Sequence, residues 1–189
     1  MLHSDAARII SKAEEVLPLV KKFRSQGQKI ILTQGVFDMV HIGHARYCQE
    51  AKKHGDVLIV GVDSDEKVKK RKGPDRPVVP QDERLEMLTY LSSVDVVVLK
   101  QITDPKYNLI KLVKPDVLVA TRDNYTAAEI VKLEELCGKV VVLEPMAVTS
   151  TSAKLRLLQI GAAKKISDKL SKKLIDTIEG VLAELKGEK

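Results

Sequence analysis

Residues 29–44 read KIILTQGVFDMVHIGH, an apolar run that leads into a glycine-containing turn and then into two histidines. The run Lys29–Thr33 is rich in aliphatic residues, which predicts a strand buried on both faces. The stretch near His44–His54 has a helical pattern. Because ligands of open α/β sheets bind beyond the carboxyl ends of the strands, the turn between this strand and helix is the first candidate site.

The same alternation of strand and helix continues along the chain. Further short apolar runs predict strands at Val57–Asp63, Val94–Leu99, Asp116–Ala120 and Lys139–Leu143. Helical patterns lie between them at Asp82–Leu91, Asp104–Val113 and Thr126–Cys137. Strands that alternate with helices pair in parallel through right-handed crossovers. The prediction is an α/β protein with a Rossmann-like five-stranded parallel sheet and helices on both faces.

Amphipathic helices are predicted at both ends of the chain. Ala6–Gln26 carries apolar side chains at helical spacing and is followed by Gly27, a helix stop signal. The segment Lys165–Lys186 places its apolar residues on one stripe. The predicted organisation is a leading helix in residues 1–27, a central domain in residues 28–161 and a C-terminal helix in residues 162–189. We expect the last helix to dock on its own domain, with a homodimer as the alternative.

Composition narrows the classes of function. Of the 189 residues, 44% are hydrophobic, enough for a buried core. No apolar run approaches the roughly 20 residues of a membrane span, and residues 1–6 lack secretory-signal features, so a cytoplasmic protein without membrane contact is expected. Cys48 and Cys137 lack disulfide or zinc spacing and are expected to be buried. The net charge of +6 suggests nucleic acid as a partner, but the aromatic content of 3% argues against surfaces on which bases would stack.

Two histidines in the turn indicate phosphate chemistry. His41 and His44 fall at the expected start of a helix, whose N–H groups attract phosphate, and Gly35 permits close approach of the backbone to a ligand. The positive end of the helix dipole disfavours imidazolium, so neutral histidines that donate hydrogen bonds are expected. Capping of the helix by one histidine is the alternative. A zinc site is discounted because neither an HExxH pattern nor a third suitable histidine is present.

The pattern in residues 35–44 is specific enough to suggest a family. Gly35–Asp38 followed by His41–His44 resembles the signature of the HxGH nucleotidyltransferase superfamily, the cytidylyltransferase-like proteins, whose fold is the alternation described above. The resemblance implies that both histidines contact the α- and β-phosphates of a nucleoside triphosphate. It also implies a nucleotide-binding role for four neighbouring residues: Gly35, Val36, Phe37 and Gly43.

A basic segment, Asp65–Pro80, follows the second predicted strand. A charge run of this kind is usually a solvated surface. Residues 72–84, however, resemble the KGPxRPxxPxxxR segment of the sugar-phosphate adenylyltransferases that make ADP-heptose. The resemblance implies that Lys72 neutralises the phosphates in the transition state and that Arg84 offers a bidentate fork to the acceptor phosphate. A salt bridge on the helix surface is the alternative for Arg84.

A hydroxyl-rich segment, residues 148–152, precedes another helical run. Hydroxyls and backbone N–H groups meet at such a helix start, where phosphate is bound readily. The segment resembles the family's ISTTxxI motif. By this resemblance, Ser150 and Thr151 hold the β- and γ-phosphates.

The loop Thr121–Tyr125 stands at the position of the family's GGDY-type loop, which lines the base and ribose. By the same resemblance, Asp123 and Tyr125 bind the nucleotide. The loop lacks the family's glycines and inserts Asn124, so the bulkier Thr121 and Arg122 are expected to narrow or recharge the base pocket. The sequence therefore does not decide which nucleotide base is bound.

The predicted reaction is attack of an acceptor phosphate oxygen on the α-phosphorus of the triphosphate, with release of pyrophosphate. ATP is the favoured nucleotide and CTP the alternative, and the acceptor is a small phosphorylated molecule such as a sugar 1-phosphate. Mg²⁺ is expected to be carried mainly by the triphosphate, with no metal site in the protein. Asp38 either orients the acceptor or stabilises the turn through an Asx contact.

Other functions remain open at this point. A glycerol-3-phosphate cytidylyltransferase-like enzyme or an FMN adenylyltransferase uses the same chemistry on another acceptor. A regulatory protein that binds a nucleotide without turnover belongs to a different class, and the altered loop at residues 121–125 leaves room for it.

Overall fold

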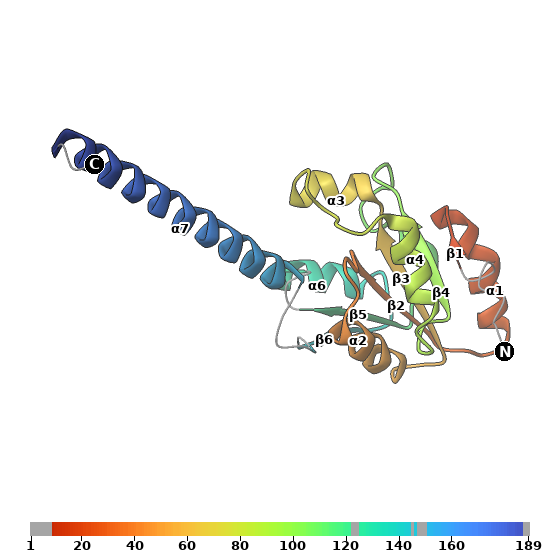
Figure 1. Cartoon of the computed structure of the whole chain (residues 1–189). Coiled ribbons are helices and arrows are strands. Elements are labelled where there is room, and N and C mark those ends of the chain that lie inside the picture. The colour runs from red at the N-terminus through yellow and green to blue at the C-terminus, as the bar shows by residue number, and fades with distance from the viewer. Residues whose placement is uncertain (1–8, 122–124, 145, 147–150, 187–189) are drawn as a thin grey trace. The chain divides into compact units, whose positions relative to one another are not determined.

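Six parallel strands form one sheet in the computed structural model, which describes residues 9–121, 125–144, 146 and 151–186. The strands are β1 (Ile9–Ile10), β2 (Ile30–Gly35), β3 (Val57–Asp63), β4 (Val96–Lys100), β5 (Val117–Thr121) and β6 (Val140–Leu143). Their order across the sheet is β1-β4-β3-β2-β5-β6, visible in Figure 1. The predicted α/β Rossmann-like fold is confirmed, with six strands rather than five.

The leading segment is not the single helix that its apolar spacing predicts. Ile9 and Ile10 form β1, which pairs with Val97 and Val98 of β4. A 3₁₀ turn, η2 (Ala13–Val16), and the helix α1 (Leu17–Ser25) follow. Pro18 lies in the first turn of α1, where its missing N–H is tolerated, whereas in the middle of a longer helix it would break the hydrogen-bond ladder. The proline was the signal against a helix over Ala6–Gln26.

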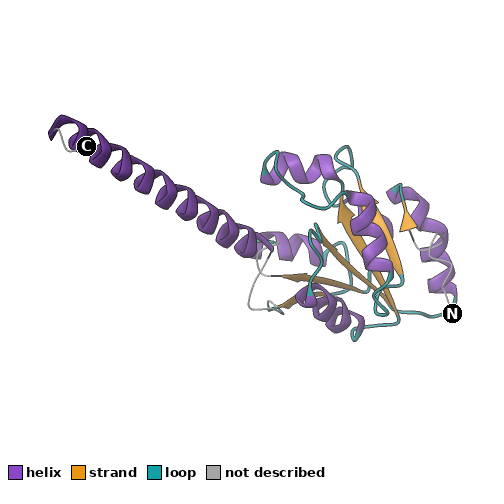
Figure 2. Ribbon diagram, viewed as in Figure 1, coloured by secondary structure: helices purple, strands orange, loops and turns teal. Residues whose placement is uncertain are grey.

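Helices cover both faces of the sheet, as Figure 2 shows. The helices that follow α1, up to residue 134, are α2 (Ile42–Lys52), α3 (Asp65–Lys72), α4 (Gln81–Thr89), α5 (Asn108–Val113) and α6 (Ala127–Glu134). On one face, the buried residues of α2 and α4 pack on Leu58 and Val60 of β3. On the other face, α1, α5 and α6 pack on Ile59 and its neighbours. Since successive side chains of a strand point to opposite faces, the fully buried β3 serves both cores.

The strand order places a switch point between β2 and β5. From β2 the chain proceeds through β3 to β4 on one side, and β5 and β6 lie on the other. Ligands of doubly wound sheets bind in the crevice beyond the carboxyl ends of the strands at such a point. The hydroxyl of Tyr47 in α2 donates to the Val119 carbonyl of β5 at 3.0 Å and lies 2.7 Å from the Thr33 hydroxyl of β2. These bonds hold α2 against the two strands of the switch point.

The basic segment Asp65–Pro80 begins with a helix that its composition does not predict. Ser64 caps α3 by accepting a hydrogen bond from the Lys67 N–H, and Gly73 ends it with a positive φ of 97°. Val68 is the one buried residue of α3. A helix with so little apolar surface shows no helical periodicity of apolar residues, which explains why the sequence pattern did not predict a helix in this segment.

The chain divides into two compact units, Met1–Val148 and Thr149–Lys189. The second unit contains α7 (Thr151–Lys186), so the predicted boundary after residue 161 falls inside this helix. Several of its large apolar side chains are exposed, among them Ile166, Leu170, Leu174, Ile178 and Val181. Docking and homodimer formation by the helix both stay predictions.

Among the described residues, no helix has the length and apolar character needed to cross a membrane. Cys48 is buried as expected, and burial raises the pKa of its thiol to about 12. Cys137 is only partly buried, which corrects the expectation for that residue.

Candidate active site

The two histidines of the turn cap the amino end of α2 in a reciprocal arrangement. His41 is the N-cap residue, and its Nδ1 accepts a hydrogen bond from the Gly43 N–H at 3.0 Å. The backbone N–H of His41 donates to Nδ1 of His44 at 3.3 Å. The sequence offered capping and phosphate binding as alternatives, yet the geometry makes them compatible. An imidazole that accepts through Nδ1 carries its proton on Nε2, which is then the donor of the ring.

The histidines lie close together, and both are half-buried. Their ring centroids are 4.2 Å apart, and the ring of Phe37 lies 5.5 Å from that of His44. Burial, followed by the neighbouring His41, lowers the pKa of His44 to about 4. The expected neutral state therefore holds for His44 at physiological pH, although burial rather than the helix dipole is the main cause.

The depressed pKa of His44 has a consequence for stability. The unfolded chain takes up this proton near the ordinary histidine pKa of 6.5, whereas the folded chain takes it up only near 4. The free energy of unfolding is therefore expected to fall as the pH drops from 6.5 to 4, by roughly 3 kcal/mol in total from this group. Urea unfolding at several pH values tests this. The His44→Asn variant should show a shallower dependence in that window, and an identical dependence would contradict it.

The turn between β2 and α2 adopts an unusual backbone. Phe37 and Met39 have positive φ values of 53° and 51°. Such conformations are unfavourable for residues other than glycine and persist only where the surrounding structure enforces them, which is common at functional sites. Val36 and Phe37 are buried. A Cβ added to Gly35 would lie 3.0 Å from a carbon of the Phe37 ring. Gly35 therefore leaves room for Phe37, a role in addition to the close ligand approach predicted for it.

Asp38 ties this turn to the loop between α3 and α4. Its buried carboxylate accepts hydrogen bonds from the N–H groups of Val78 and Val79, at 3.1 and 3.0 Å. It also pairs with Arg76, whose Nη2 lies 2.7 Å from Oδ2. Between the two roles predicted for Asp38, these contacts favour the structural one. They reach across to a distant loop, whereas the predicted Asx contact is local.

Asp38→Asn is expected to reduce turnover and to lower the free energy of unfolding by roughly 3 kcal/mol, because the largely buried Arg76 loses its counter-charge. The loop that follows Lys72 would then lose its anchor. Steady-state assays together with urea unfolding measure both effects. Asp75→Asn, at an exposed position of the same loop, is the matched control and should change neither quantity. Equal behaviour of the two variants would contradict the anchoring role.

Lys72, predicted from the sequence to act on the phosphates, lies within electrostatic reach of His44. It is the last residue of α3, just before Gly73. Burial and the charges of Arg71 and Arg76 lower its pKa, and the charges of Asp38 and Asp63 oppose that shift. Lys72 in turn helps to lower the pKa of His44. Each group thus lies within electrostatic reach of the other.

Arg84 has a different place from the one predicted. Its side chain is buried, with 1% of the residue exposed. The guanidinium donates to three backbone carbonyls and one carboxylate, which belong to Val36, Asp63, Val79 and Asp65. A fork engaged on all these partners does not offer itself to an acceptor phosphate. Arg84 instead joins the ends of β2 and β3 to the start of α4.

Sequence reasoning missed a cluster of charges beyond β3 and β4. The carboxylate of Asp63, 3% exposed, lies 3.0 Å from Nζ of Lys100 and 3.0 Å from Nη2 of Arg71. Nζ of Lys67 lies 4.0 Å away. We call these four side chains the Asp63 cluster. The available signal was that Asp63 and Lys100 each end an otherwise apolar strand.

Of the two residues assigned to nucleotide binding in the loop Thr121–Tyr125, the structure describes Tyr125. Its hydroxyl accepts a hydrogen bond from Nε2 of Gln34, at 3.4 Å, at the end of β2. Burial raises its pKa to about 12, so the phenol is protonated at neutral pH. Asp123 and Ser150 lie outside the described residues. Thr151 begins α7, but its side chain is outside them too, so the roles of these three residues stay predictions.

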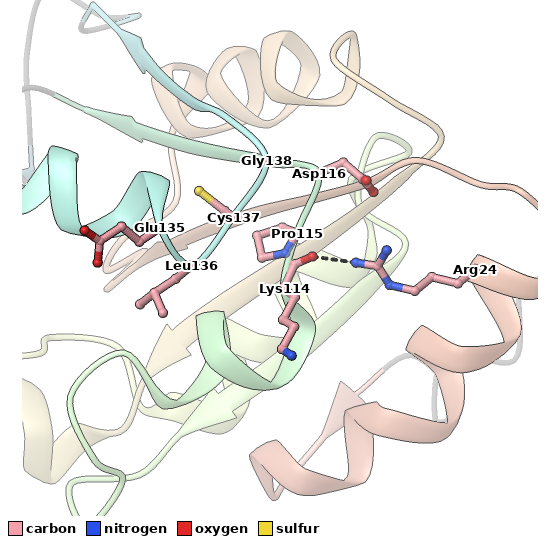
Figure 3. A pocket seen from close by; sticks show the side chains of 8 residues that line it. All are labelled: Arg24, Lys114, Pro115, Asp116, Glu135, Leu136, Cys137 and Gly138. Carbon is pink, nitrogen blue, oxygen red and sulfur yellow. Dashed lines mark hydrogen bonds between the residues drawn. The ribbon is translucent and has the colours of Figure 1, made fainter.

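The structure also has a cavity at the opposite edge of the sheet (Figure 3). The cavity has a volume of about 490 Å³ and is lined by residues that include Arg24, Lys114 and Asp116, near the amino end of β5. Arg24 donates to the carbonyls of Val113 and Lys114, and Asp116 accepts from the Ile30 N–H. These groups join α1, α5 and the strand ends. We therefore assign the residues around the cavity a structural role and do not place the active site there.

The fold and the histidine turn together define a class of protein. A doubly wound sheet with paired histidines at the first helix beyond the switch point is the arrangement of the nucleotidyltransferases with an HxGH turn. The chain belongs to the cytidylyltransferase-like family, whose model matches residues 32–167. The resemblance noted in the sequence is thereby confirmed.

Individual relatives narrow the likeness. The Bifunctional protein HldE of Nitratiruptor sp. is 48% identical over 122 residues, which are 65% of this chain and 26% of the relative. That of Wolinella succinogenes is 41% identical over 152 residues, 80% of this chain and 31% of the relative. The chain thus spans about a quarter to a third of the length of these relatives. A crystal structure of the lipopolysaccharide core biosynthesis protein from Thermoplasma volcanium is 32% identical, with a TM-score of 0.55, over 63% of this chain and 98% of that one.

Proposed function

We propose that the chain transfers a nucleotidyl group, adenylyl in the favoured case, from a nucleoside triphosphate to a small phosphorylated acceptor and releases pyrophosphate. The observation that carries the proposal is the reciprocal cap of His41 and His44, which fixes both rings at the start of α2 with Nδ1 as the acceptor atom. Nε2–H donors held in this way stabilise charge on phosphate oxygens without any change of protonation.

The reaction needs no nucleophile from the protein. An oxygen of the acceptor phosphate forms a bond to the α-phosphorus, and the bond from that phosphorus to the bridging oxygen of the β-phosphate breaks, so that pyrophosphate leaves with the electron pair. His41 and His44 donate to oxygens of the α- and β-phosphates, and Lys72 neutralises charge where the phosphates meet. The predicted part of Ser150 and Thr151 is to hold the leaving pyrophosphate. Catalysis then consists of positioning and charge stabilisation.

Mg²⁺ enters the proposal as an ion carried by the triphosphate, where it would neutralise phosphate charge. Among the described residues, no three His, Cys, Asp or Glu side chains gather as a metal site would require. The two buried carboxylates at this edge, Asp38 and Asp63, are each paired with cations. This donor set fits an ion bound mainly by the nucleotide.

The relatives favour a sugar phosphate among the acceptors. The name of the Thermoplasma volcanium protein places it in lipopolysaccharide core biosynthesis, which is a carbohydrate pathway. Glycerol 3-phosphate with CTP, and FMN with ATP, remain the alternative substrate pairs. A non-catalytic nucleotide-binding role is the alternative of another class. Cytoplasmic location and a homodimer through α7 stay predictions beside the reaction.

Pyrophosphate release measured for each nucleotide with each acceptor tests the proposal. ATP, CTP, GTP and UTP are combined with heptose 1-phosphate, glycerol 3-phosphate and FMN, in the presence of Mg²⁺. We expect turnover with ATP and the sugar phosphate that stops when a chelator removes the metal. Nucleotide binding without pyrophosphate release in any pairing would favour the regulatory alternative.

A further inference from the structure

The two residues that the sequence assigns to the acceptor are already engaged within the protein. Asp38 holds Arg76 and the N–H groups of Val78 and Val79, and Arg84 is buried with its donors on protein oxygens. A phosphorylated acceptor still needs cationic partners near the carboxyl ends of the strands, where the nucleotide is proposed to bind. The Asp63 cluster lies near these ends and has them.

Three cations surround a single buried carboxylate in the cluster, so positive charge is in excess. The exposed fraction of the side chain is 17% for Lys100, 28% for Lys67 and 57% for Arg71. The cationic groups are thus held by the buried carboxylate of Asp63, and part of each side chain remains accessible to a ligand from the solvent side. A phosphate monoester, which is a dianion near neutral pH, is a ligand whose charge balances this excess.

Lys100 is held in place by the packing of its stem. The register of the sheet pairs Asp63 with Lys100 and Gly61 with both Gln34 and Val98. A Cβ on Gly61 would lie 2.9 Å from Cδ of Lys100 and 3.1 Å from Cγ of Gln34. The missing side chain of Gly61 therefore makes room for the lysine stem. The ammonium group is directed toward Asp63 rather than free to sample solvent.

We propose that the Asp63 cluster is the acceptor subsite, in which Lys67, Arg71 and Lys100 bind the phosphate of the acceptor and Asp63 positions them. This inference rests on the proposed function and assigns its second substrate. Arg71 directly precedes Lys72, and Asp63 acts electrostatically on Lys72. The acceptor phosphate thus lies between the cluster and Lys72, beyond β3 and β4. The crevice at β2 and β5 is left to the nucleotide.

Direct binding to the full chain tests the subsite. Isothermal titration calorimetry compares heptose 1-phosphate with the same heptose lacking phosphate, and ATP is titrated separately. In the wild type, the phosphorylated sugar should bind more tightly than the free sugar. Lys100→Met should weaken binding of heptose 1-phosphate about 10- to 100-fold, the loss expected for one charge-assisted hydrogen bond, and leave the free sugar and ATP unchanged. Lys70→Met, at an exposed position of α3, is the matched control and should bind as the wild type does.

Contrary outcomes separate this inference from the proposed function. Unchanged heptose 1-phosphate binding in Lys100→Met, or no preference of the wild type for the phosphorylated sugar, would overturn the subsite even if pyrophosphate release is observed. Selective loss in Lys100→Met without pyrophosphate release by the wild type would support the subsite and refute the reaction. Should Lys100→Met fail to fold, Lys67→Met, at a more exposed member of the cluster, replaces it with the same expected and contrary results. In an active enzyme, both variants should raise KM for the acceptor more than they lower kcat.

Discussion

Replacing His44 by alanine is expected to lower kcat for pyrophosphate release about 100- to 1000-fold, the effect of removing one positioned donor to developing charge. The ring of His44 is fixed by the His41 N–H, which donates to its Nδ1 at 3.3 Å. Its low pKa keeps the ring neutral, so the variant removes a hydrogen-bond donor and not a charge. The lost cap should cost only about 1 kcal/mol of folding free energy.

Two comparisons make this result specific to the turn. His54→Ala changes a histidine that follows the carboxyl end of α2 and should retain wild-type turnover. ATP binding by His44→Ala, measured by calorimetry, should survive in large part because other groups also hold the nucleotide. If His44→Ala unfolds, or if it turns over as His54→Ala does, the histidine is a structural cap and the assigned role is wrong.

Replacing Arg84 by methionine is expected to destabilise the protein by about 3 to 5 kcal/mol, the cost of breaking a buried charged network by removing one partner. The change leaves the carboxylate of Asp65 and three carbonyls without their donor. Two of the carbonyls, those of Val36 and Asp63, lie at the ends of β2 and β3, so local packing beneath the active site is disturbed as well. Denaturant unfolding of wild type and variant measures the loss.

The same variant decides between the two roles of Arg84. A residue that binds the acceptor would raise its KM and leave the unfolding midpoint near that of the wild type. Glu83→Gln, at the neighbouring exposed position of α4, is the control for a change of charge in this helix. An unchanged midpoint for Arg84→Met with a raised acceptor KM would restore the role predicted from the sequence.

Local patterns were sufficient to predict five of the six strands and the turn that carries the histidines. The apolar run at Ile30–Gly35 and the histidines after it lie in one continuous stretch, so their relation is set by strand and helix periodicity alone. The switch point follows from the parallel connections. The role of Lys72 stays a prediction from a motif, and the helix that carries this residue was not expected.

Long-range pairing explains what the sequence did not predict. Asp63 and Lys100 are 37 positions apart and meet only because β3 and β4 adopt the observed register. The burial of Arg84 likewise depends on carbonyls of Val36 and Asp63, which belong to other segments. The two-residue strand β1 is too short for any periodic signal, and its pairing with β4 gives it its structure.

In the proposed reaction, the histidine turn positions a nucleoside triphosphate so that its nucleotidyl group passes to a phosphorylated acceptor. The most direct measurement follows ATP labelled in its α-phosphate during incubation with heptose 1-phosphate and Mg²⁺. The label should appear in a product that also contains the sugar, while unlabelled pyrophosphate accumulates in equal amount, and His44→Ala should lose both signals together. Label that stays in ATP, or that is released as AMP without attachment to the sugar, would contradict the proposed nucleotidyl transfer.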